Sequence, residues 1–61
     1  MSYYRITIID WSKKNGKIIS TRFAYGLASA RSIVGIPLHY AKGVDAWFAY
    51  AGDLEYMVCK C

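Results

Sequence analysis

Residues 3–25, YYRITIIDWSKKNGKIISTRFAY, decide the fold of this chain. Two runs rich in β-branched and aromatic residues, 3–12 and 17–25, flank Asn15-Gly16. Asn-Gly between such runs is a strong hairpin signal, because a two-residue type I′ turn needs positive φ at both central positions. The stretch therefore predicts an antiparallel hairpin in which Lys14 pairs with Lys17.

The predicted turn also fixes which side chains share a face of the hairpin. It sets Ile8 opposite Phe23 and Ile6 opposite Tyr25, and side chains alternate between faces along a strand. The expected core face carries these apolar residues: Tyr4, Ile6, Ile8, Ile19, Phe23 and Tyr25. A three-residue loop with a bulge would shift one strand and change the assignment, but the clean apolar grouping favours the two-residue turn.

The middle of the chain predicts one short helix over residues 27–34. Leu27, Ala30 and Val34 recur near the helical period, and alanine favours the helix. Gly35 and Pro37 are expected to end it. Residues 36–43 are compatible with either a further helical turn or an irregular loop.

The last third of the chain predicts a second hairpin, residues 44–51 and 54–61, around Gly52-Asp53. This register places Asp45 opposite Lys60. Both faces of the hairpin are apolar, a pattern typical of strands that are covered on both sides.

Together these elements predict an α+β fold (ββαββ) in a single small domain, residues 1–61. Two β-hairpins form a four-stranded antiparallel sheet, and the short helix between them packs on one face. A chain of 61 residues has a marginal core, so it needs disulfides, a metal, oligomerisation or an unusually apolar interior. Its hydrophobic content of 56% favours oligomerisation or an apolar interior.

Composition limits the possible settings of the protein. No apolar run is long enough to span a membrane, and no secretory signal is visible, so we expect a cytoplasmic protein with free thiols at Cys59 and Cys61. The net charge of +4 permits attraction to nucleic acid or to an acidic protein. The basic residues are nevertheless spread along the chain.

A short helix cannot cover both faces of the predicted sheet, so one apolar surface needs another cover. The candidates are the 36–43 segment, a second copy of the chain or a foreign partner. The expected surface joins Trp11, Ile9 and Ile18 to either the Trp47/Tyr56 set or the Phe48/Tyr50 set. Trp, Tyr and Arg dominate binding hot spots, so we predict this binding surface: Arg5, Ile9, Trp11, Ile18, Arg22, Trp47 and Tyr56.

Catalytic and metal signatures are weak. His39 is the sole histidine, and no local motif joins it to a nucleophile and a carboxylate. Cys59 and Cys61 point to the same side of a strand, but with His39 they give three ligands, one short of a closed zinc site. The glycines form no phosphate-binding loop. We therefore expect no enzyme activity, no metal and no cofactor.

Two functional hypotheses lead, and a cysteine-based metal or redox site at Cys59 and Cys61 is a third. The first is a non-enzymatic binding protein that regulates or inhibits a macromolecular protein partner by surface contact, as a homodimer, in the manner of small accessory or inhibitor proteins such as those of phages. The second is single-stranded nucleic-acid binding, in which Trp11 stacks on bases while Arg5 and Arg22 hold phosphate.

Overall fold

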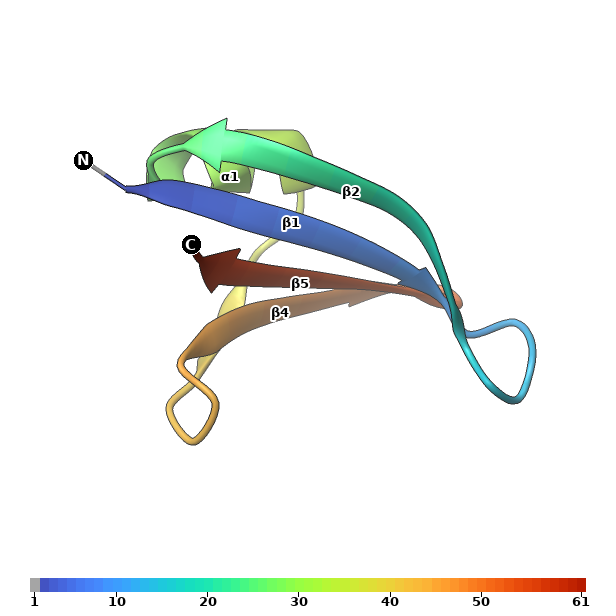
Figure 1. Ribbon diagram of the computed structural model, residues 1–61. Helices are drawn as coiled ribbons and strands as arrows, with labels where there is room; N and C mark the ends of the chain where they lie inside the picture. The colour runs from blue at the N-terminus through green and yellow to red at the C-terminus, as the bar shows by residue number, and fades with distance from the viewer. Residues whose placement is uncertain (1) are drawn as a thin grey trace.

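The computed structural model describes residues 2–61, which form an α+β fold with one helix and a five-stranded antiparallel sheet. Figure 1 shows α1 at the end of the sheet where β1 and β2 lie. The strands run in the order β2-β1-β5-β4-β3, so the first and last strands of the chain lie side by side in the middle of the sheet. The element bounds are β1 Tyr3–Asp10, β2 Lys17–Tyr25, α1 Leu27–Val34, β3 His39–Ala41, β4 Ala46–Ala51 and β5 Leu54–Lys60.

The predicted number of four strands is wrong, because the undecided segment contains a fifth. β3 pairs with β4, and Tyr40 lies opposite Trp47 with its ring centroid 5.0 Å away. The turn that follows includes Asp45 with a positive φ of 51°. Asp45 accepts a hydrogen bond from the Tyr40 hydroxyl and lies outside the β4–β5 ladder, which begins at Ala46. The expected pairing of Asp45 with Lys60 is therefore not formed.

The predicted helix and the predicted second hairpin are confirmed. α1 spans Leu27–Val34 and ends at Gly35, whose φ of 77° and ψ of 0° form a left-handed cap that a residue with a Cβ adopts at a cost. Ala51 pairs with Leu54 across Gly52-Asp53, as the two-residue turn requires.

The predicted register of the first hairpin is wrong. Tyr3 pairs with Tyr25 and Ile6 with Arg22, and a bulge near Ile19 interrupts the ladder. Six residues, 11–16, connect the strands, and Asn15 is not among the residues with positive φ, so the turn is not type I′. This change of register moves Phe23 and Tyr25 to the opposite face of the sheet from Ile6.

Two contacts explain the longer connection. After β1 the chain continues along the β5 side, where the Trp11 amide donates to the Asp53 carbonyl at 2.7 Å. The helix also begins two residues after β2 ends, so the end of β2 must lie close beneath it. Ala24 and Ala30 are both buried there, and their small side chains allow a close approach that Phe23 or Tyr25 would prevent.

The core lies on one face of the sheet, which we call the helix face. Buried side chains of β1, β2, β4 and β5 meet α1 there: Ile6, Ala24, Ala30, Val34, Ala49 and Val58. Ile36 and Leu38, from the segment that leaves α1, pack against the same cluster, with Trp47 and Tyr56. Among residues 2–61, Ile6 and Val58 are the largest side chains that are fully buried. Within the same range, no helix is long and apolar enough to cross a bilayer.

Candidate binding surface

The other face of the sheet carries no helix from residues 2–61, and we call it the open face, on which two small residues, Thr7 and Ala46, are buried. Its members follow from the strand pairings, because paired residues share a face. They lie in four rows across the sheet: Tyr25 and Tyr3; Phe23, Arg5, Cys59, Ala46 and Ala41; Thr21, Thr7, Met57, Phe48 and His39; Ile18, Ile9, Glu55 and Tyr50.

Large apolar side chains on the open face are exposed to solvent. Phe23 is 63% exposed and Tyr50 is 66% exposed, and Tyr3, Ile18 and Tyr25 are about half exposed or more. The chain exposes 4347 Å² in total, whereas a compact monomer of 6.9 kDa exposes about 4,000 Å². An accessible surface larger than that of a compact monomer is expected for a sheet whose helix covers one face only.

A hydrogen-bonded aromatic cluster closes one end of the open face. Glu55 accepts from the Trp11 indole Nε1 at 2.8 Å through Oε1 and from the Tyr50 hydroxyl at 3.0 Å through Oε2. The Tyr50–Glu55 hydrogen bond raises the pKa of Tyr50, because the bond requires the phenol proton. These three residues border a hollow of about 430 Å³ beside the 52–53 turn. The cluster fixes two large rings at the rim of the open face.

Gly16 allows Trp11 to reach Glu55. The indole lies directly over Gly16, and a Cβ added there would come within 2.6 Å of the ring. The φ of Gly16 is also positive, at 63°. The Asn15-Gly16 step therefore serves to seat Trp11, a role that the hairpin pattern in the sequence does not reveal.

The predicted binding residues divide between the two faces. Arg5, Ile9 and Ile18 lie on the open face, and Trp11 joins it through Glu55. Arg22 pairs with Ile6, and Trp47 and Tyr56 pack against the core, so these three belong to the helix face. Of the two sets weighed from the sequence, Phe48/Tyr50 is the one that continues the surface of Trp11, Ile9 and Ile18.

Sequence reasoning missed several residues of the open face. The register predicted from Asn15-Gly16 places Phe23 and Tyr25 in the core, and the sequence indicates no role for Tyr3. Glu55 has no sequence signal at all, since its partner Trp11 is 44 residues away. The 36–43 segment, considered as a cover, packs Ile36 and Leu38 against the helix face and then continues as the edge strand β3, so it extends the sheet.

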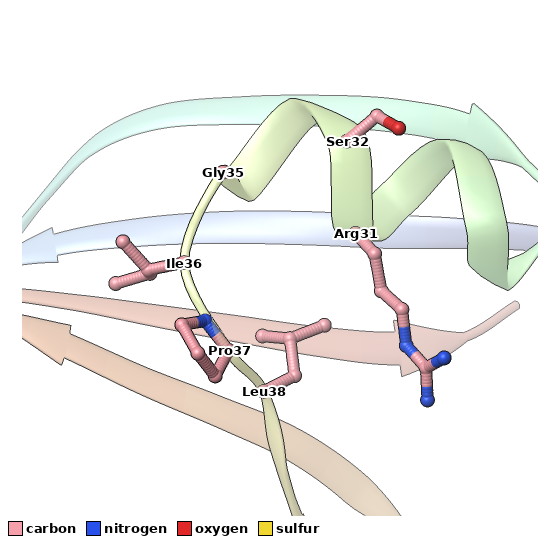
Figure 2. A pocket seen from close by; sticks show the side chains of 6 residues that line it. All are labelled: Arg31, Ser32, Gly35, Ile36, Pro37 and Leu38. Atoms are coloured by element: carbon pink, nitrogen blue, oxygen red, sulfur yellow. The ribbon is translucent and has the colours of Figure 1, made fainter.

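Other features of the molecule offer less. A hollow on the helix face lies between the end of α1 and the segment 35–38, and Figure 2 shows Ile36, Pro37 and Leu38 along one side with Arg31 beyond them. It is open to solvent, and Arg31 is the charged residue in its lining. Among residues 2–61, no group of three or more histidine, cysteine, aspartate or glutamate residues could hold a metal ion. Cys59 and Cys61 carry free thiols.

Comparison with known proteins adds no functional constraint: the chain matches no protein-family model, no characterised protein and no solved structure. The open face therefore has to be interpreted from its own chemistry.

Proposed function

We propose that this protein is a small non-enzymatic binding protein, which regulates or inhibits a protein partner by covering part of its surface with the open face. The observation that carries the proposal is the uncovered, aromatic sheet face. Contiguous apolar patches of several hundred Å² on a soluble chain mark contact sites. Tyrosine and arginine, which dominate the energetics of such contacts, are both present on it.

The charge on the open face favours a protein over a nucleic acid. Arg5 and Glu55 are the charged side chains on its four rows, so the face has no excess of positive charge. The nucleic-acid hypothesis required Arg5 and Arg22 on one surface, and the register places them on opposite faces. Affinity for nucleic acid depends on several cations that neutralise phosphates together.

Site-specific photo-cross-linking in the native cell tests the proposal. A photoreactive phenylalanine analogue replaces Phe23 on the open face, and the matched control carries it at Ile33, which is exposed on α1. We expect position 23 to give one discrete adduct with a different protein, which excess unlabelled wild-type protein suppresses and which position 33 does not give.

Two outcomes would overturn the proposal. Equal adducts from both positions, or none from either, would remove the special role of the open face. An adduct with nucleic acid at position 23 would favour the single-stranded nucleic-acid hypothesis instead.

A further inference from the structure

We infer that the open face binds a second copy of the same chain, in a face-to-face dimer whose two-fold axis runs along the row of Thr7 and Met57. The inference rests on the proposed function, since it takes the open face to be a contact surface and names a second copy of the chain as one protein that binds there. Three features carry it: the positions of the two charges, the size pattern of the side chains, and the area of the face.

The two charged side chains lie symmetrically about the proposed axis. Arg5 is two residues before Thr7 in β1, and Glu55 is two residues before Met57 in β5. Because the two strands are antiparallel, these steps run in opposite directions along the strand axis. Each step of two residues is about 6.7 Å along a strand, and the neighbouring strands are about 4.8 Å apart. A two-fold axis along the Thr7–Met57 row therefore brings Arg5 of each copy within side-chain reach of Glu55 of the other.

This reciprocity is what a two-fold interface requires, because the same patch must complement itself. Two like charges at these two positions would be brought together by the axis, whereas opposite charges pair. Here each Arg5 meets a Glu55 whose two oxygens are already oriented by Trp11 and Tyr50. A carboxylate has lone pairs for a further donor, so the additional pairing displaces neither hydrogen bond.

The sizes of the side chains follow the same symmetry. The axis exchanges the row of Arg5 with the row of Glu55, and so it sets Tyr50 of one copy over Ala46 of the other. Tyr50 is 66% exposed, whereas Ala46 is a small, buried residue that pairs with Cys59 and Ala41. Large residues over small ones allow two sheets to interdigitate at the usual spacing of about 10 Å.

The area of the open face indicates how tightly the two copies should associate. Four strands and four rows span roughly 20 by 25 Å, which is about 500 Å² of projected area on each copy. Stable interfaces bury about 800 Å² of accessible surface on each partner, and weaker ones bury less. We therefore expect a reversible dimer with a concentration-dependent mass. Dimer formation and the docking of another protein on the open face are then mutually exclusive.

Sedimentation equilibrium of purified charge variants tests this arrangement. Arg5→Glu places a second carboxylate opposite Glu55 at both ends of the homodimer interface, and we expect its dissociation constant to rise at least about tenfold. The substitution also lowers the net charge of +4 by two units, which by itself would favour association. Arg22→Glu makes the same charge change on the helix face and should leave the dimer intact.

Mixing two variants gives the sharper measurement. Glu55→Lys alone should also dissociate, since it places a second cation opposite Arg5. In a mixture of Arg5→Glu with Glu55→Lys, a heterodimer pairs the two introduced charges with each other at one end. At the other end the native Arg5 of one variant meets the native Glu55 of the other, so the two monomeric variants should associate. Far-UV circular dichroism of each variant confirms that the fold persists.

A wild-type protein that is monomeric up to millimolar concentration would overturn the inference. So would a dimer that Arg5→Glu does not weaken, or a mixture that stays monomeric. The proposed function would survive these results if Phe23 still cross-links to a different protein in the cell, and it would fall with the inference if Phe23 gives no adduct.

Discussion

Replacing Gly16 by alanine should destabilise the protein through Trp11. The new Cβ would lie 2.6 Å from the indole ring, so the ring must move away and lose its hydrogen bond to Glu55. The positive φ of 63° at Gly16 adds a conformational cost of about 1 kcal/mol. Loss of the solvent-exposed hydrogen bond costs about 1 kcal/mol more. The lower entropy of the unfolded alanine chain offsets about 0.5 kcal/mol, so the expected loss is about 1.5 kcal/mol.

Gly52→Ala is the matched control for this change. Gly52 has a similar φ of 59°, but no atom lies within 4 Å of an added Cβ. It should therefore show the backbone cost alone, about 0.5 kcal/mol after the same entropic offset. The difference of about 1 kcal/mol between the two variants measures the displacement of Trp11.

Urea unfolding followed by far-UV circular dichroism, at one fixed protein concentration, provides the two free energies. A second pair of variants in a Trp11→Ala background completes the cycle. There Gly16→Ala and Gly52→Ala should cost the same, because the ring that separates them is gone. If Gly16→Ala still costs more in that background, or costs no more than Gly52→Ala in the wild type, then the indole does not depend on Gly16.

Three other predictions concern the core and the titrating groups. Ile6→Val should lower the free energy of unfolding by about 1 kcal/mol because Ile6 is fully buried, while Ile33→Val on the exposed side of α1 should change it by less than about 0.5 kcal/mol in the same urea assay. The hydrogen bond to Glu55 raises the pKa of Tyr50 in the folded state, so the stabilising effect of this bond is complete below the unfolded pKa and is lost as the pH rises through the folded pKa. In an alkaline titration of tyrosinate absorbance, Tyr50→Phe should therefore remove a tyrosine that ionises late. Loss of a tyrosine that ionises early would contradict the assignment. The backbone amide of Ser12 donates to the Asp10 carboxylate at 2.9 Å and lowers the pKa of Asp10, so this hydrogen bond stabilises the fold above the unfolded pKa and is lost as the pH falls through the folded pKa. Asp10→Asn should therefore weaken the fall in the free energy of unfolding at acid pH. An unchanged acid dependence would contradict this role of Asp10.

Local signals in the sequence were sufficient for the helix and the second hairpin. The segment Leu27 to Val34 combines helical periodicity with alanines. Gly52-Asp53 forms a two-residue turn between two apolar runs, and these runs form β4 and β5. Both predictions depend on neighbours in the chain, and both are confirmed. The third strand was missed because His39–Ala41 is three residues long, too short for a pattern of alternation to be visible.

The register of the first hairpin could not be obtained from local signals, because distant contacts decide it. The Trp11 amide binds Asp53, the Trp11 indole binds Glu55, and Ala24 has to lie beneath the helix. These contacts outweigh the preference of Asn15-Gly16 for a type I′ turn. In the observed register Phe23 lies on the open face and Arg22 lies on the helix face, the reverse of the predicted arrangement. The sequence therefore predicted that an apolar face would be uncovered, and it misassigned part of that face.

The central position of β1 and β5 also has a kinetic consequence. Ile6 lies opposite Val58 in the middle of the sheet, so the two largest fully buried side chains come from the first and last strands. Closing a loop of about 50 residues to join them costs about 3.5 kcal/mol of chain entropy beyond a constant term. The first hairpin can form without β5 and pack against α1, but Ile6 lacks Val58, its fully buried neighbour, until β5 arrives. Refolding should therefore be limited by this long-range encounter, and a transient species with an unpaired β1 edge should be the stage most exposed to aggregation.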